Sequence, residues 1–135
     1  MSENAHHTAP TRFVEAAGIR FAYRRFGKSG GVPLVFFQHF TGNMDNWDPA
    51  VTDGLARDRD VVLFNNAGIS TTNGETPTTV AGMARDAAAF IDALVEELDL
   101  APFMAAHDEP RGMPPYHPAL MLKVLLYGYA TGVRS

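Results

Sequence analysis

The apolar and polar positions of the first two thirds of the chain predict alternating strands and helices. Unbroken apolar runs within residues 34–37 and 60–64 predict two strands that are buried on both faces. Ahead of them, partial alternation over residues 12–26, interrupted at Gly18, predicts a half-exposed antiparallel pair. Residues 27–33 and 65–77 are rich in turn-forming residues and predict loops.

Two helices are predicted between and after the buried strands. Asp48 followed by Pro49 is a helix start, and this helix is expected to run to about Arg57. Thr78 or Thr79 caps the second helix, whose apolar residues follow the 3,4 spacing of one buried face: Val80, Met83, Ala84, Ala87, Phe90, Ile91, Leu94 and Leu98. Strands that alternate with helices predict an α/β fold with a parallel sheet, here of about four strands and two helices.

The pattern changes after about Leu94. Five prolines fall between residues 102 and 118, and no strand is predicted there. A last helix, over residues 118–130, is apolar nearly all round, with Lys123 its one charge. A helix of this kind is stable only when most of its surface is buried. The residues from Val95 onward are too few to bury it by themselves.

Composition narrows the class of protein. The net charge of −4 gives no reason to expect a nucleic-acid or membrane surface. The chain has no cysteine, which excludes disulfides and cysteine-ligated metal. No apolar stretch is long enough for a membrane span, and the first dozen residues are polar and lack the apolar core of a signal peptide. We therefore expect a cytoplasmic protein, with residues 1–11 as a flexible tail.

Two short motifs match catalytic patterns without the context that those patterns require. Residues 27–31 fit G-x-S-x-G, and residues 22–29 fit a loose P-loop. A nucleophile elbow and a phosphate loop both lead into a helix, whereas a strand is predicted after this loop. We therefore interpret residues 27–33 as a connection between two strands.

The sequence does not predict a metal or cofactor site. Asp45, Asp48 and Asp53 have no calcium-loop spacing, and capping or solvent exposure explains them better. The adjacent His6 and His7 stand in a polar tail, where solvated side chains are expected. The isolated residues His107 and His117 are interpreted as surface or capping groups.

Residues 12–94 resemble the N-terminal part of an α/β-hydrolase, as an ordered set of motifs. Residues 18–23 (GIRFAY) resemble its opening hairpin, and residues 33–47 (PLVFFQHFTGNMDNW) resemble its third strand and oxyanion turn. Residues 60–70 (DVVLFNNAGIS) resemble the fourth strand and its loop, and residues 76–81 open the helix that precedes the nucleophile.

This resemblance implies half of an active site. The backbone N–H of Phe40 would be one oxyanion donor. His39, Thr41 and Trp47 would line a pocket for a small acyl or ester-type ligand.

At four positions the sequence departs from the motifs of the resemblance. Gln38 stands where the motif usually has histidine, and His39 where it has glycine. Asn65 and Ser70 replace the usual aspartate and glycine of the following loop. A side chain at position 39 would hinder the close approach of a ligand to the backbone, which glycine permits.

Residues 95–135 resemble the N-terminal region of an insertion-sequence transposase. The resemblance rests on VEELDL at residues 95–100 and on RGMPPYHPALMLKVLLYGYATGVRS at residues 111–135. The segment holds 3 basic residues (Arg111, Lys123, Arg134) and 5 acidic ones (Glu96, Glu97, Asp99, Asp108, Glu109), so DNA binding by it alone is not expected. An ordinary helical hairpin that closes a small domain is the alternative interpretation.

Together these patterns predict a chimaera that lacks the nucleophile, acid and histidine of a hydrolase and is inactive alone. Two alternatives are a nucleic-acid-associated transposase fragment and a small hydrolase completed by a partner chain. In the hydrolase resemblance the strand at 34–37 would pair with an absent fifth strand. We therefore expect an uncovered apolar edge, with self-association or low solubility and loose packing.

Overall fold

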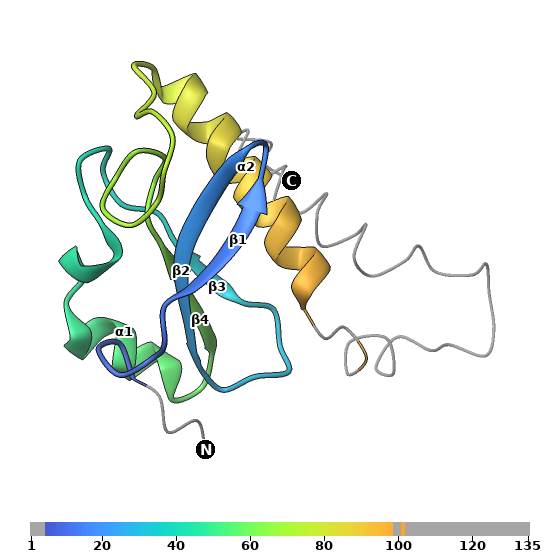
Figure 1. The fold of residues 1–135 in the computed structure, drawn as a ribbon. Helices are drawn as coiled ribbons and strands as arrows, with labels where there is room; N and C mark the ends of the chain where they lie inside the picture. The colour runs from blue at the N-terminus through green and yellow to red at the C-terminus, as the bar shows by residue number, and fades with distance from the viewer. Residues whose placement is uncertain (1–4, 99–100, 102–135) are drawn as a thin grey trace, which may run out of the picture.

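A computed structural model describes residues 5–98 and 101 as an α/β structure (Figure 1). Its helices and strands alternate along the chain as the sequence predicts. In chain order they are β1 (Arg12–Ala16), β2 (Ile19–Gly27), β3 (Leu34–Phe36), the 3-10 helix η1 (Met44–Asn46), α1 (Pro49–Ala56), β4 (Asp60–Phe64) and α2 (Val80–Glu97). The predicted fold class is thus confirmed.

The four strands form one mixed sheet in the order β1-β2-β4-β3. β1 and β2 are the predicted hairpin, closed by Ala17 and Gly18, whose φ angles of 50° and 76° lie in the left-handed region. β2 also pairs antiparallel with β4, whereas β3 pairs parallel with β4. The sheet is therefore parallel only at its β3–β4 end, where a helical connection, α1, links the two strands.

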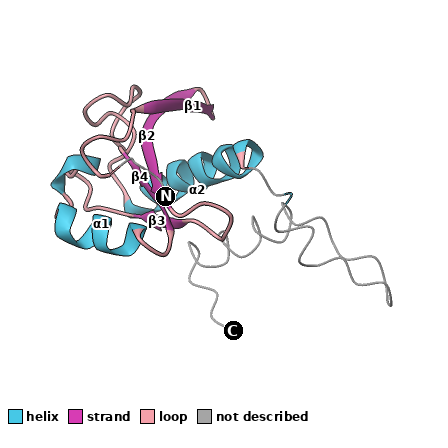
Figure 2. Ribbon diagram, turned by 90° about the horizontal axis from the view of Figure 1, so that it is seen from below, coloured by secondary structure: helices cyan, strands magenta, loops and turns pink. Residues whose placement is uncertain are grey.

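The two helices cover opposite faces of the sheet (Figures 1 and 2). β4 is buried along its whole length, and its residues alternate between the faces. Val62 and Phe64 pack with α2, whereas Val61 and Leu63 pack in a second cluster on the α1 side. An apolar strand with no polar alternation is what a central strand between two helical layers requires.

Helix α2 begins after the Thr79 cap, whose side chain accepts a hydrogen bond from the N–H of Gly82. Its predicted apolar face is largely confirmed, with Phe90 at 0% and Leu94 at 2% exposure. Val80 is an exception, because its side chain is 83% exposed in the first turn.

Strand β3 is half-exposed, so the prediction of a fully buried strand over residues 34–37 is wrong. Leu34 is 38% exposed and Phe37 is 51% exposed. The physical reason is the place of β3 in the sheet: it pairs with β4 on one side, and no strand of residues 5–98 pairs with the other. Within this part of the chain the expected uncovered edge is present.

The segment before β1 is packed against the sheet from residue 5 onward. Residues 5–9 form a single turn, closed by the N–H of Ala9 donating to the carbonyl of Ala5 at 2.8 Å. Ala9 joins the core on the α1 side, and His6 is fully buried. The expectation that His6 is solvated is therefore wrong, because the turn lays its imidazole against the Phe26 ring, 6.2 Å away.

The predicted helix over residues 118–130, the proline-rich segment before it, and both His107 and His117 lie outside the described residues. Among the helices that the structure does describe, none combines the length and apolar character needed to cross a bilayer.

Candidate functional site

The predicted oxyanion turn lies where β3 ends, at the carboxyl edge of the parallel β3–β4 pair. The N–H of Gly42 donates to the carbonyl of His39 at 2.9 Å and closes the turn. Phe40, at its corner, is 55% exposed. Within residues 5–98 the backbone N–H of Phe40 donates to no acceptor, so it is free for a ligand oxygen.

Gln38 anchors the start of this turn to the neighbouring strand. Its Nε2 donates to the carbonyl of Phe64 at 2.7 Å, and its Oε1 accepts from the indole Nε1 of Trp47 at 3.5 Å. A side-chain amide can donate and accept at once, which a carboxylate or an ammonium cannot. Gln38, at the position usual for histidine, therefore serves as a bridge between β4 and the residues after the turn.

Asn65 performs a similar task from the end of β4. Its Oδ1 accepts from the N–H of Met44 at 2.8 Å, and its Nδ2 donates to Thr71 Oγ1 at 3.1 Å. It thus joins η1 to the loop over residues 65–79. Ser70 in that loop has a φ of 52°, a left-handed conformation that glycine adopts at less cost.

His39 and Thr41 pair with each other on the exposed side of the turn. Thr41 Oγ1 lies 3.0 Å from His39 Nδ1. The imidazole also lies over Gly42, since a Cβ added there would stand 3.0 Å from Nε2. The side chain at position 39 is accommodated because it is exposed and lies over Gly42, which has no side chain of its own.

The four predicted site residues lie close together along the chain. His39, Phe40 and Thr41 are exposed, and Trp47 is half-buried with its ring 4.8 Å from that of Phe36. A pocket lined by His39, Thr41 and Trp47 stays a prediction.

A large open cavity lies at the other end of the strands, where β4 begins and β2 ends. Its volume is about 1030 Å³, and its lining includes Gly27, Lys28 and Asp60. Asp60 begins β4 and Gly27 ends the antiparallel β2, so this cavity is a strand length away from the predicted oxyanion turn.

The G-x-S-x-G match lies beside this cavity, where its first glycine has a structural role. Gly27 has a φ of 97°, and a Cβ there would come within 2.2 Å of the Arg59 carbonyl. Lys28 continues the contact by donating its N–H to that carbonyl at 2.9 Å. The interpretation of residues 27–33 as a strand-to-strand connection is confirmed, because β3 follows directly.

The three aspartates considered as ligands have different partners. Asp48 caps α1 by accepting from the N–H of Ala50 at 2.8 Å, as predicted. Asp53 accepts from the N–H of His6 at 2.8 Å. Asp45 forms an ion pair with Arg24 and lies close to the histidines of the N-terminal turn, a contact that no sequence pattern predicts. No periodic signal links positions 6, 7 and 45, so only the fold brings them together.

Solved structures similar to this chain are α/β-hydrolase fold proteins. An α/β-hydrolase fold protein from Chitinophaga pinensis is 49% identical with a TM-score of 0.65, and the match covers 67% of this chain and 33% of that one. N-formylmaleamic acid deformylase from Pseudomonas putida S16 is 25% identical with a TM-score of 0.53, over 67% and 34% of the two chains. Est816, an N-acyl homoserine lactone degrading enzyme, is 28% identical with a TM-score of 0.51, over 62% and 31%. The chain thus spans about a third of the length of these proteins.

A different family matches the other end of the chain. The family described as "Transposase domain (DUF772)" matches residues 81–135. No curated protein matches the sequence. Both resemblances inferred from the sequence are therefore confirmed: a hydrolase-like fold and a transposase-like segment occur in one chain.

Helix α2 lies within both parts. The transposase match begins at residue 81, yet α2 fills one face of the hydrolase-like sheet. Near its end Val95 is buried in the same core, and Tyr23 Oη donates to Glu97 Oε2 at 2.8 Å. Burial, and then the hydrogen bond to Glu97, raise the pKa of Tyr23 above its usual value. Helix α2 is thus packed in the hydrolase-like core and also lies within the transposase match.

Proposed function

We propose that residues 5–98 are the oxyanion half of an α/β-hydrolase site and that this chain does not hydrolyse esters by itself. The observation that carries the proposal is the free Phe40 N–H at the carboxyl end of β3, where no hydroxyl–imidazole pair of residues 5–98 is oriented by a carboxylate. A donor in this position stabilises negative charge that develops on a carbonyl oxygen. Without a nucleophile and a base, a bound ester meets only that stabilisation.

The hydroxyl groups of the described residues support this proposal. Ser29 and Ser70, the two serines of residues 5–98, are both exposed and make no hydrogen bond to a histidine. Nucleophilic catalysis needs the hydroxyl within hydrogen-bond reach of a base that a third group orients. Among these residues, two imidazole–hydroxyl contacts occur: His6 with Thr52, which is buried, and His39 with Thr41.

The His39–Thr41 contact defines the alternative of a small hydrolase completed by another chain. It places a hydroxyl beside an imidazole nitrogen at 3.0 Å, next to the proposed donor. However, no carboxylate of residues 5–98 hydrogen-bonds His39, so nothing in this part of the chain orients the base. We therefore assign this pair to the structure of the turn.

Hydrolysis of p-nitrophenyl acetate by the purified chain tests the proposal. We expect the rate to equal that of a matched variant, Thr41→Val, and of buffer at the same pH. Turnover that is abolished by Thr41→Val but kept in Ser29→Ala would contradict the proposal and establish the completed-hydrolase alternative. The Ser29→Ala control changes an exposed hydroxyl that lies beside the cavity at the other end of the strands.

A second candidate function follows from the transposase match at residues 81–135. A transposase-derived segment would contact DNA chiefly through basic residues, and binding would weaken steeply with salt. Because acidic residues outnumber basic ones in residues 95–135, we expect no salt-sensitive retention on a duplex. A cytoplasmic location and a small acyl ligand at the turn stay predictions from the sequence.

A further inference from the structure

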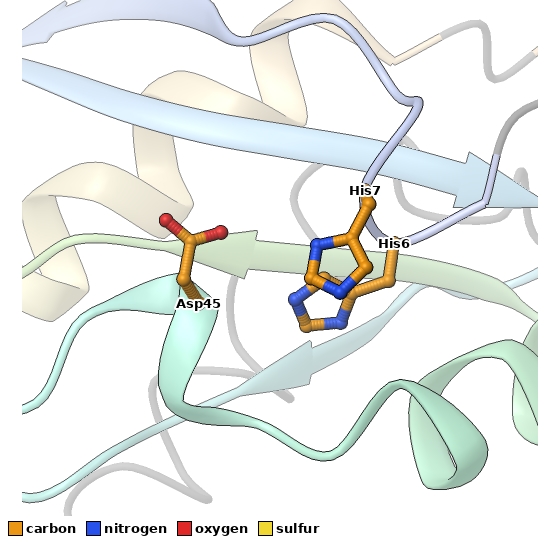
Figure 3. Close-up of side chains that lie close together, drawn as sticks. All are labelled: His6, His7 and Asp45. Carbon is orange, nitrogen blue, oxygen red and sulfur yellow. The ribbon is translucent and has the colours of Figure 1, made fainter.

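Three possible metal ligands lie close together on the α1 side of the sheet. His6 and His7 come from the N-terminal turn, and Asp45 comes from η1 (Figure 3). One ligand atom of each lies within 4.8 Å of the others. Figure 3 shows the two imidazole rings beside each other, and their centroids are 4.8 Å apart.

The first of these ligands, His6, is held as a metal-binding histidine is usually held. It is fully buried, and its Nδ1 lies 2.8 Å from Oγ1 of the buried Thr52. The Thr52 hydroxyl lies within 3.5 Å of the carbonyls of Asp48 and Pro49, to which it can donate. It can therefore accept from Nδ1–H, which leaves the lone pair on Nε2. Histidine ligands characteristically donate their second ring nitrogen to such a partner.

The Nε2 atom of His6 has no hydrogen-bond partner among the described residues, although it is buried. A buried polar atom without a partner costs free energy, commonly on the order of 1–3 kcal/mol. An electron-pair acceptor at Nε2 would satisfy this atom.

The other two ligands are exposed and can adjust. In a tetrahedral zinc site the ligand atoms stand on the order of 3.3 Å apart, as metal–ligand distances of about 2.0–2.1 Å require. His7 and Asp45 can close the remaining gap by side-chain rotation, because neither is packed in the core. Asp45 is already oriented by its ion pair with Arg24.

Charges of both signs lie close to the cluster. Arg24 pairs with Asp45 and would repel an incoming metal ion. The carboxylate of Asp53, which accepts from the N–H of His6 at 2.8 Å, offsets part of that repulsion.

We propose that His6, His7 and Asp45 bind a divalent transition metal, with Zn²⁺ the best match. Imidazole and carboxylate are ligands that Zn²⁺ accepts, and three protein ligands leave a fourth position for water. The metal would fasten the N-terminal turn to η1, directly after the turn that carries Phe40. The site is independent of the proposed oxyanion turn, since it uses none of residues 39–42.

Calorimetric titration of the metal-free, tag-free 135-residue chain with Zn²⁺ near pH 7.5 tests the site. We expect one equivalent to bind, and His7→Gln and Asp45→Asn each to weaken binding by at least about tenfold. Both substitutions change exposed side chains, so the fold should persist and can be checked by circular dichroism. Two controls, His39→Gln and the double variant His107→Gln/His117→Gln, should retain the wild-type affinity.

A second measurement tests whether zinc stabilises the folded chain. Zn²⁺ that binds only the folded chain raises the urea midpoint as its concentration rises. We expect this rise in the wild type and not in Asp45→Asn. The proposal is overturned if no zinc binds, or if binding survives both ligand substitutions. Binding that is lost in the His107→Gln/His117→Gln control would also overturn it.

Discussion

Replacement of Phe90 by alanine tests whether α2 is an integral part of the hydrolase-like core. Phe90 is fully buried, and its ring stacks on that of Phe64 at 4.4 Å between centroids with an interplanar angle of 13°. The rings of Phe21 and Tyr23 lie 5.5 and 5.9 Å away. The side chain thus joins the helix to both central strands of the sheet.

The expected cost follows from these contacts. Truncation of a buried phenylalanine to alanine removes its transfer free energy and leaves a cavity, at about 3–5 kcal/mol. A domain of this size has a total stability on the order of 5–15 kcal/mol. We therefore expect Phe90→Ala to lose much of the folded population. The matched control, Val80→Ala in the same helix, should change stability by no more than about 0.5 kcal/mol, because Val80 is 83% exposed.

Urea unfolding, followed by the fluorescence of the single tryptophan, Trp47, measures both variants. The probe lies on the α1 side of the sheet, so a large effect of Phe90→Ala there would show that the two faces unfold together. A loss below about 1 kcal/mol would refute the reasoning, since it would mean that α2 is only loosely packed. That result is what the loosely packed state predicted from the sequence would give.

Three further predictions concern the edge strand, the end of α2 and the turn. Leu34→Lys should reduce self-association with little loss of stability, because a charge blocks pairing at an exposed edge; light scattering that is unchanged would contradict this. Since the pKa of Tyr23 is raised, its contribution to stability is present below about pH 10 and is lost as pH rises through the folded pKa. The difference in phenolate absorbance between the wild type and Tyr23→Phe should therefore show late ionisation. A group that titrates at about 10 would be evidence against the burial of Tyr23 and its contact with Glu97. Gln38→Ala removes the hydrogen bond to the Phe64 carbonyl and should lower the free energy of unfolding in urea by about 1 kcal/mol. An unchanged free energy of unfolding would show that this hydrogen bond does not stabilise the fold.

Strong local patterns made most of the fold predictable. The proline after Asp48 and the cap at Thr79 each placed a helix start to within one residue, because caps are local hydrogen-bonding motifs. The apolar run of β4 likewise marked a central strand. These patterns do not predict the order of the strands in the sheet. The residues of β3 are as apolar as those of β4, yet β3 lies at the edge of the sheet.

The candidate site was predictable only in part, for a related reason. The position of Phe40 follows from a strand that ends in a turn, which the sequence displays. The tasks of Gln38 and Asn65 depend on which backbone groups of other segments lie nearby, and no local pattern encodes that. His6 looked solvated because its neighbours along the chain are polar, whereas its neighbours in space are Phe26 and Thr52.

The contact between the two parts of the chain bears on how such a chimaera can persist. A flexible junction would leave the apolar face of the sheet uncovered, with the aggregation that exposed apolar surface brings. Instead, α2 supplies Phe90 and Val95 to that face, although it lies within the transposase match. The same apolar spacing is compatible with a helix of a hydrolase and with a helix of a transposase, so one helix can belong to both segments.

Covalent labelling with a fluorophosphonate most directly tests the central claim, that this chain carries an oxyanion half-site without an activated nucleophile. The reagent phosphonylates hydroxyl groups that an adjacent base activates, and intact-mass spectrometry reports the adduct. Our account predicts that the folded chain remains unmodified while an active serine hydrolase in the same tube is labelled completely. A stoichiometric adduct on the folded chain, absent after unfolding in urea, would contradict it.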